Sequence, residues 1–519
     1  MSALSGRIDA APSEVWHDEV LAPQFTYEVN HLLPHYLAIE RVLLVEYRRM
    51  GLLDAAQCAA VADRLRGITR DTIVADPRAN TSDIAFAIER HVTDGLAEPP
   101  PAWHVDRSRN DLQATAQLMF AREQVLAAAE ALLAFDDAAA RHAATTAELP
   151  MPGFTHLQAA QIISPGFWLA AVSAEAQRAL RRLTASYQEL EAAPLGAGAM
   201  AGQELPWDRG RMAALLGFAA VNPHALVAVA SRGAVLGVAA DLSGLGVALS
   251  RFCTDLMTWG SSEYRFIDLP DALSGISSAM PQKKNFPILE RIRGRTAHLS
   301  ALHLDMTVGQ RNTPYTNMVE VSKEAGVHLL LLFDTARSVL RLFTTVLTEL
   351  RFDGDAMLAA CEREYLGGFT LANLLTLRAG LPWRQAQVVA GRYVVAAIER
   401  GLPPGKPDGA LLAAIAADAG HPLGGADENG GTYRDPDGGS GGTWRHTIAE
   451  ELLAEAFTVH GALRAKRSDG STNPKAVGEL LRAQRREHQE LTVWVQARRA
   501  VLRQAADDLD AELGRAVGT

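Results

Sequence analysis

Three polar clusters in the sequence carry side chains whose chemistry could be combined in one site. The most informative occupies residues 277–285, Ser-Ser-Ala-Met-Pro-Gln-Lys-Lys-Asn, and Glu290 follows it five residues later. A serine acts as a base only as an alkoxide, so Ser277 needs a nearby cation and directed N–H groups, which Lys283 and the loop amides can supply. Two lysines and Asn285 beside the serines suit developing negative charge. The alternative is a solvated basic loop. This alternative is disfavoured because the segment is flanked by glycine, lies between apolar helices and belongs to an acidic chain.

The second cluster lies at residues 152–161 and contains Thr155, His156 and Gln158. Histidine is the natural proton carrier at neutral pH, Thr155 can donate to an anion, and Gln158 can orient a substrate group. The alternative is a hydrogen-bonded surface histidine in a Pro/Gly turn. Taken alone, this motif favours the surface histidine over catalysis.

The third cluster, residues 107–111, reads Arg-Ser-Arg-Asn-Asp. The planar fork of Arg109 suits a dicarboxylate, and Asn110 and the free N–H groups of a helix start add further donors. Because serine and asparagine are also good N-caps, a capped and solvated helix start at Ser108 explains the segment equally well.

The elements that must position these clusters are long helices. From Leu329 the apolar positions advance by three and four residues, which is the spacing of one helical face. Similar patterns run through residues 114–139, 163–190 and 227–256. Alternating strand patterns are scarce. The sequence therefore predicts a mainly α fold with a central bundle of long helices.

Chain breakers suggest where domains begin and end. The Pro-rich residues 98–101 end an N-terminal segment, and the long helices continue to residues 351–354, after which we expect shorter helices. We place an N-terminal helical domain, a central bundle domain and a C-terminal helical domain at residues 1–110, 111–355 and 356–519. The glycine-dense residues 421–442 are interpreted as a loop in the last domain.

Composition excludes several classes of protein. The chain has 519 residues, and 50 Lys and Arg against 60 Asp and Glu give a formal net charge of −10, which argues against a nucleic-acid binder. The 48% of hydrophobic residues suffices for large cores. The three cysteines are scattered outside any CxxC pattern, which excludes a disulfide framework and fits a reducing cytosol. No uninterrupted apolar run reaches about 18 residues, so we expect no membrane span and a cytoplasmic location.

Two further patterns bear on cofactors. Residues 196–202 look like a dinucleotide fingerprint, but the last glycine spacing is one residue too long and no strand precedes it, so we interpret them as a tight turn. The sequence has no HExxH, no phosphate-binding P-loop and no EF-hand loop, so no catalytic metal is predicted.

Together, the three clusters resemble the motifs of the fumarase/aspartase superfamily, and specifically of the argininosuccinate lyase family. The family patterns Ser-Arg-Asn-Asp, Pro-Gly-aromatic-Thr-His-Leu-Gln and Ser-Ser-x-Met-Pro-Gln-Lys-Lys-Asn are matched at residues 108–111, 152–158 and 277–285. Residues 194–202 and 315–323 agree further. The similarity extends from about residue 39 to about residue 400, and then patchily to residue 481.

This resemblance implies a three-domain fumarase/aspartase-like fold, a homotetramer around a shared bundle, and active sites assembled from three subunits. It also implies β-elimination of an N-substituted aspartate to fumarate and an amine, without a cofactor. By resemblance Ser277 is the base on a closing loop, Lys283 and Asn285 hold the carboxylate, and His156 is the acid/base partnered by Glu290. The matching substrate-binding positions are Ser108, Arg109, Asn110, Thr155, Gln158, Ser278, Asn285, Tyr315, Glu320 and Lys323.

The chain departs from the family pattern on the side of the leaving amine. Glu320 stands where the family usually has Gln, residues 231–233 replace an Asp-Arg-Asp-like segment, and the N-terminal Ser-x-x-Tyr-Asp-like element is not recognisable around residues 24–28. Argininosuccinate is the leading candidate substrate. The alternative is a specialised lyase for another N-substituted aspartate, such as a diamine or hydrazine adduct, run in the amine-addition direction. A catalytically silent structural homologue is disfavoured, because the catalytic positions are all occupied by the expected residues.

Overall fold

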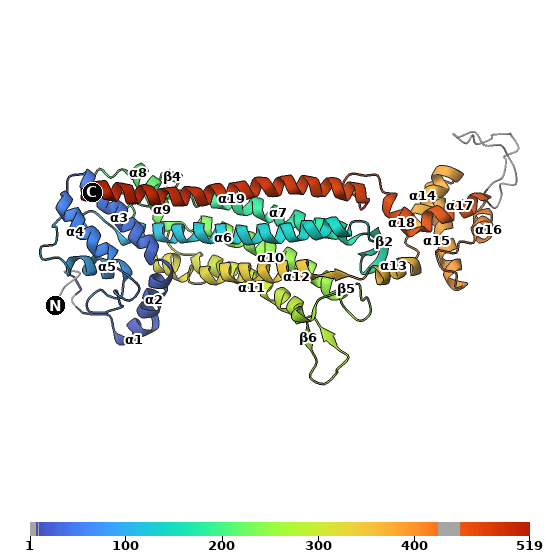
Figure 1. Ribbon diagram of the computed structural model, residues 1–519, viewed down its shortest axis with the longest axis horizontal. Helices are drawn as coiled ribbons and strands as arrows, with labels where there is room; N and C mark the ends of the chain where they lie inside the picture. The colour runs from blue at the N-terminus through green and yellow to red at the C-terminus, as the bar shows by residue number, and fades with distance from the viewer. Residues whose placement is uncertain (1–6, 9, 424–446, 519) are drawn as a thin grey trace.

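Six long helices form the body of the molecule in a computed structural model that describes residues 7–8, 10–423 and 447–518 (Figure 1). They lie side by side and are α6 (Arg109–Thr146), α7 (Pro165–Glu189), α10 (Gly233–Trp259), α11 (Pro287–Gln310), α12 (Leu329–Glu349) and α19 (Pro474–Val517). The mainly α fold and the predicted bundle are therefore confirmed. The glycine-dense loop predicted at 421–442 lies outside the described residues from residue 424 onward.

The apolar stripes read from the sequence are the faces that the bundle buries. On α12, Leu332, Phe333, Val339 and Phe343 are all fully buried, at the spacing that predicted the helix. Helix α6 has 38 residues, so at a rise of about 1.5 Å per residue it is about 57 Å long. That length sets the distance between the two ends of the bundle.

Short helices surround the end of the bundle at which α6 begins (Figure 1). The N-terminal segment supplies most of them, and the chain between α7 and α10 supplies two more. They are α1 (Glu14–Trp16), η1 (His17–Leu21), α2 (Ala22–His31), α3 (Leu33–Arg49), α4 (Ala55–Arg66), α5 (Ile84–Thr93), α8 (Arg209–Leu215) and α9 (Ala225–Ala230).

A second group of helices lies at the opposite end of the bundle (Figure 1). Its members are α13 (Gly354–Arg363), α14 (Gly368–Ala379), α15 (Trp383–Glu399), α16 (Gly409–Asp418), α17 (Thr447–Phe457) and α18 (Val459–Arg464). Helices α14 to α17 enclose a small hydrophobic core of their own, which includes Leu375, Val389 and Leu453. The three-domain division of the chain stays a prediction.

The strands are short and occur in pairs. Strands β1 (Met151–Thr155) and β2 (Gln158–Ile163) form an antiparallel hairpin beyond the end of α6. Strands β3 (Ala192–Ala193) and β4 (Ala220–Val221) pair in parallel, and β5 (Ile267–Asp268) pairs with β8 (Arg351–Phe352). After the single turn η2 (Asp271–Leu273), β6 (Gly275–Ile276) and β7 (Lys284–Asn285) form a hairpin that projects away from the bundle (Figure 1).

Helix α19 differs from the expectation that only shorter helices follow residue 355. It has 44 residues and runs back along α6 and α7, where Leu491, Val495 and Leu509 join the main hydrophobic core. Its buried positions are widely spaced among charged residues, so the apolar stripe is hard to recognise in the sequence. The C-terminus therefore lies beside the N-terminal helices (Figure 1).

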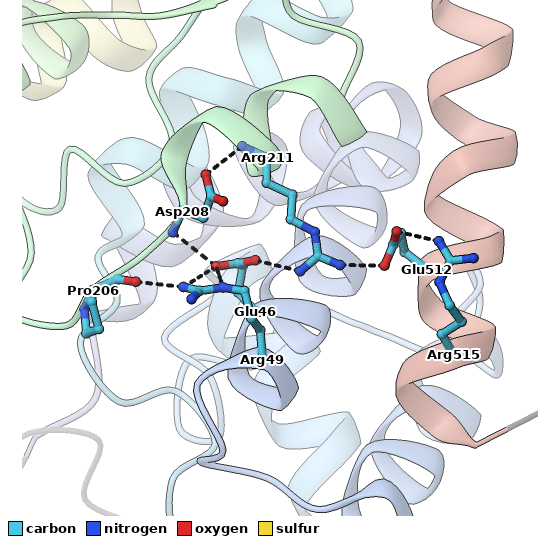
Figure 2. A network of polar contacts seen from close by, with 7 residues as sticks. All are labelled: Glu46, Arg49, Pro206, Asp208, Arg211, Glu512 and Arg515. Carbon is cyan, nitrogen blue, oxygen red and sulfur yellow. Dashed lines mark hydrogen bonds and ion pairs between the residues drawn. The ribbon is translucent and has the colours of Figure 1, made fainter.

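A network of ion pairs attaches the last turns of α19 to the N-terminal helices (Figure 2). The fully buried carboxylate of Glu46 on α3 contacts Arg49 at 2.8 Å and Arg211 on α8 at 3.2 Å. Arg211 also pairs with Glu512 of α19, and Arg515 pairs with the same Glu512. Since a buried carboxylate is stable only when it is paired, Arg211 both satisfies Glu46 and links it to the last turns of α19.

One described helix, α10, is long and apolar enough by composition to cross a membrane. It packs between α7 and α11, and Leu242, Leu249 and Leu256 are buried there. Its apolar sequence is therefore accounted for by its place in the bundle.

Candidate active site

The residues predicted to form a carboxylate clamp begin α6. Ser108 is the N-cap, and its side chain accepts a hydrogen bond of 3.2 Å from the N–H of Asn110, so the capped helix start is confirmed. Arg109 is more than half exposed, pairs with Asp83 at 2.9 Å and lies over the ring of Phe86. The Asn110 side chain donates to the carbonyl of Ala199 at 2.9 Å. Both side chains thus lie on the outer face of the helix end and are oriented by neighbours.

Asp111 holds the glycine-rich turn against this helix start. Its buried carboxylate accepts hydrogen bonds from the N–H groups of Gly196, at 2.9 Å, and Gly198, at 3.0 Å. Burial raises the pKa of Asp111 to about 7, although these hydrogen bonds lower it. Both glycines have positive φ, so the segment is a tight turn, as predicted, and its N–H groups are directed at a protein carboxylate. The expectation that no strand precedes it was wrong, because the two-residue strand β3 ends at Ala193.

Beneath the same loop, a buried ion pair fixes the backbone that leads to Ser108. Arg107 pairs with Glu40 of α3, and neither side chain is appreciably exposed. The guanidinium of Arg107 also lies over the ring of Trp103. Sequence reasoning missed Glu40 and Asp111 as contributors, because their contacts join segments far apart in the chain.

Lys323 belongs to the same end of the bundle. It lies in the π-helical turn η3 (Glu320–Glu324), which the side chains of Gln113 and Gln117 hold against α6 by donating to the carbonyl of Ser322. The ammonium of Lys323 pairs with the buried Glu28 of α2 at 3.3 Å. Tyr315 and Glu320 lie before and at the start of this turn, and both are exposed.

The projecting hairpin positions Ser277. The Ser277 hydroxyl accepts hydrogen bonds from the backbone N–H groups of Met280, at 3.0 Å, and Ala279, at 3.4 Å. Two converging N–H groups stabilise negative charge on the oxygen that they contact. Ser278 is exposed beside it. The loop therefore supplies the directed amides that a serine base needs.

The two adjacent lysines of this hairpin have different environments. Lys284 pairs with Asp268 at 2.9 Å and Asp271 at 3.3 Å, and hydrogen bonding to Asp268 raises the pKa of Lys284. Lys283 has no such acidic partner among the described residues. With Asn285 and Glu290 it lines a cavity of about 1080 Å³ at the base of the hairpin.

His156 sits at the tip of the β1–β2 hairpin, with Thr155 and Gln158 on either side of the turn. His156 and Leu157 are the two central residues, with φ of +54° and +61°. Positive φ at two consecutive residues other than glycine is strained, and such strain is concentrated at functional sites. All four turn residues are exposed, and His156 makes no hydrogen bond or ion pair to the rest of the described chain, Glu290 included.

One chain does not bring the three clusters together. Ser108 begins α6 and the β1–β2 hairpin follows its end, so about 57 Å of helix lies between Arg109 and His156. Ser277 lies between β6 and β7, in the hairpin that projects away from the bundle (Figure 1). The predicted residues thus form three separate groups, each at least partly exposed. No set of three or more described His, Cys, Asp or Glu side chains is arranged to hold a metal ion.

Comparisons with known proteins converge on one group of enzymes. A family model described as "Lyase" matches residues 54–299. The chain is 33% identical to argininosuccinate lyase of Exiguobacterium sp. over 68% of this chain and 76% of that protein. It is 31% identical to argininosuccinate lyase of Methanothermobacter thermautotrophicus over 70% of this chain and 77% of that protein.

Solved structures share the fold. EDDS lyase in complex with formate superposes with a TM-score of 0.81 at 22% identity, covering 99% of this chain and 97% of that chain. A class II fumarase from Schistosoma mansoni superposes with a TM-score of 0.63 at 16% identity, covering 77% of this chain and 91% of that chain.

Proposed function

The chain belongs to the argininosuccinate lyase family, and from this premise we propose that it is a carbon–nitrogen lyase that eliminates an amine from an N-substituted aspartate and releases fumarate. The observation that best supports this chemistry is the environment of Ser277. Its hydroxyl accepts two backbone N–H groups on the hairpin that also carries Lys283 and Asn285. A serine alkoxide is the base for which such an arrangement is suited.

The reaction places its main demand on charge stabilisation. Ser277 removes a proton from the carbon beside a carboxylate, and the negative charge develops on that carboxylate. Lys283 and Asn285 are placed to hold it, and preorganised donors of this kind are the largest contributors to catalysis in such sites. Proton transfer by a positioned base and acid adds factors on the order of 10² to 10⁴ each.

We assign the departing amine to the second cluster. His156 protonates it, and Glu290 of another subunit orients the imidazole. The substrate is bound by the other predicted residues, which are Ser108, Arg109, Asn110, Thr155, Gln158, Ser278, Tyr315, Glu320 and Lys323. Elimination breaks the carbon–nitrogen bond. Ser277 removes the proton from carbon and His156 protonates the amine, so the reaction needs no cofactor.

The separation of the three clusters supports a shared site. Because about 57 Å of α6 separates Arg109 from His156, these residues serve one site only if they come from different copies of the chain. We propose a homotetramer around the shared long-helix bundle, in which three subunits contribute to each site. Long exposed apolar side chains on the bundle helices, such as Val247 of α10 and Leu304 of α11, are available for such contacts.

The wider setting follows from the same premise. We propose a cytoplasmic enzyme whose partners are an N-substituted aspartate and fumarate, with no nucleic acid and no membrane, since the net charge is −10 and the three cysteines are free and buried. The three-domain division at residues 110 and 355 is part of this proposal.

Argininosuccinate is the first substrate to test. Fumarate release is followed by ultraviolet absorbance with argininosuccinate and with a panel of N-substituted aspartates. Release from any of them supports the lyase, and silence across the whole panel from well-folded protein would overturn it. Growth of an arginine auxotroph that lacks its own lyase would assign argininosuccinate, whereas release only from other adducts assigns a specialised lyase. Glu320 is exposed and stands where the family motif carries Gln. This difference is the reason to test the specialised lyase as the second candidate.

A further inference from the structure

A partly open cavity lies behind Lys323, between α2, α6, α10, α11 and the turn η3. Its volume is about 320 Å³, and most of its wall is apolar, with Leu118, Val235 and Met306 among the lining residues. Ligand sites in proteins have this size and character, with a few polar groups that fix the orientation of an otherwise apolar ligand. Among the polar side chains that line it, two buried ones each have an atom without a hydrogen-bond partner among the described residues.

The first of these groups is the carboxylate of Glu28. It is 3% exposed, and one oxygen accepts hydrogen bonds from Lys323 and Gln24, both at 3.3 Å. The second oxygen is buried and has no hydrogen-bond partner among the described residues. Burial raises the pKa of Glu28. A ligand N–H at this oxygen would satisfy a carboxylate that the protein leaves half satisfied.

The second group is the guanidinium of Arg232. Its Nε donates to Gln117 at 3.2 Å, and one terminal nitrogen donates to the carbonyls of Val229 and Ser231. The other terminal nitrogen is buried without a partner, and no carboxylate pairs with Arg232 in the part of the chain that the structure describes. Burial lowers its pKa to about 10, so the side chain stays charged at neutral pH. A buried cation of this kind favours an anionic ligand.

We propose that this cavity binds the leaving amine, and that this amine is an apolar amino acid. Its carboxylate meets Arg232, its nitrogen donates to Glu28, and its hydrocarbon body packs on the apolar wall. The inference rests on the proposed function, because Lys323 both lines the cavity and occupies a substrate-binding position.

The chemistry of the cavity distinguishes between classes of amine. The buried carboxylate, Glu28, already pairs with Lys323, and the other two lining carboxylates, Glu19 and Glu324, are exposed. A second positive charge at the buried end of the ligand would therefore meet apolar side chains and no free carboxylate. A simple alkylamine would leave Arg232 without an anion. The reaction then balances as for any member of the family: the carbon–nitrogen bond of the N-(1,2-dicarboxyethyl) amino acid breaks, the base takes the carbon-bound proton, and the nitrogen leaves with one proton as the free amino acid.

Four probes test the cavity by calorimetry on the full chain: leucine, isopentylamine, 4-methylpentanoate and arginine. Leucine carries an amino group and a carboxylate, whereas isopentylamine lacks the carboxylate and 4-methylpentanoate lacks the amino group. We expect leucine to bind at least about tenfold more tightly than either, because each analogue leaves one buried protein group unpaired. Equal binding of isopentylamine, or tighter binding of arginine, would overturn the inference.

Two variants place the binding in the cavity. Ala114→Leu fills it from α6 and should weaken leucine binding at least about tenfold, whereas Ala144→Leu, at an exposed position of the same helix, should leave it unchanged. Arg232→Gln should abolish the preference for leucine over isopentylamine. Leucine binding that survives both Ala114→Leu and Arg232→Gln contradicts the assignment, and the second variant remains informative should the first fold poorly.

The reverse reaction separates this inference from the proposed function. Fumarate is incubated with each amine, and the adduct is detected by mass. An adduct with leucine supports both the lyase function and the apolar amino acid as the leaving amine. An adduct with arginine alone upholds the lyase and overturns the apolar amino acid, whereas no adduct and no fumarate release from the panel of aspartates overturns the lyase itself.

Discussion

The Ser277 hydroxyl lies 3.0 Å from the backbone nitrogen of Met280 and accepts its hydrogen bond. The N–H of Ala279 points at the same oxygen, so the hairpin stabilises an alkoxide at this position with its own backbone. The side chain therefore depends little on distant parts of the chain for its orientation.

Ser277→Ala tests this arrangement. We expect fumarate release to fall by a factor on the order of 10³ or more, because the base is lost, while the free energy of unfolding changes by less than about 0.5 kcal/mol. The matched variant is Ser278→Ala, one residue further along the exposed loop, which retains the base and should raise KM, since Ser278 is assigned to substrate binding, with little loss of kcat. Near-normal turnover of Ser277→Ala would reject the assigned base.

Lys283→Gln removes the cation assigned to the developing carboxylate charge. We expect kcat to fall by about 10² to 10³, as for the loss of one preorganised donor. Lys284→Gln is the control, because Lys284 already pairs with Asp268 and Asp271 and should affect hairpin stability more than kcat. A larger loss of kcat in Lys284→Gln than in Lys283→Gln would show that Lys284, and not Lys283, stabilises the developing carboxylate charge.

Coexpression of Ser277→Ala with His156→Asn chains tests whether sites are shared. Each variant alone should be inactive, and random assembly should restore roughly a quarter of the wild-type activity, because some sites then combine an intact serine with an intact histidine. Activity is measured on purified mixed oligomers. Failure to recover any activity from mixed oligomers of normal size would place both residues in the same chain's site.

The ion pair between His488 and Asp136 makes the packing of α19 depend on pH. Three groups donate to the buried Asp136: Ser173 at 2.6 Å, Gln177 at 3.1 Å and His488 at 2.8 Å. Hydrogen bonding to Asp136 raises the pKa of His488. Since the folded-state pKa exceeds the unfolded value, the protonated pair adds stability at low pH, and this contribution is lost as the pH rises through the folded-state pKa.

His488→Asn should therefore destabilise the protein more below about pH 6 than at about pH 9, and the difference should be about 1 kcal/mol. Urea-unfolding midpoints at the two pH values measure it. The exposed histidine of α11 supplies the control His298→Asn, which replaces a histidine that forms no ion pair among the described residues. A pH-independent effect of His488→Asn would show that the charge on the imidazole does not contribute.

Local patterns predicted the scaffold well. The helices predicted from three- and four-residue spacing at 114–139, 163–190 and from Leu329 are α6, α7 and α12, and Ser108 caps α6 as its sequence indicates. The pattern at 227–256 was predicted as one helix, but Ser231 and Arg232 divide it into α9 and α10. Helix α19 was missed because most of its surface is charged, and only isolated positions such as Val495 are buried. Its helical state comes from tertiary packing that no short window of sequence contains.

Only those parts of the candidate site that lie within one short segment could be predicted from the sequence. Ser277 and Lys283 share one hairpin, so their proximity follows from the sequence. The pair between Glu28 and Lys323 joins residues 295 positions apart, and Arg107 with Glu40 joins α3 to the start of α6. Such contacts depend on how helices cross, which the spacing of apolar residues does not specify.

The place of α19 in the core also governs the order in which the protein can be completed during translation. The segment of α19 is synthesised after the other five long helices, yet its side chains Leu491 and Leu509 pack in a core formed by helices made much earlier. Until then the nascent bundle exposes the apolar surface that these side chains cover, and chaperones bind such transiently exposed surface. The core is therefore complete only after residues 474–517 have been made, and a chain cut short before α19 should be degraded more readily by proteases.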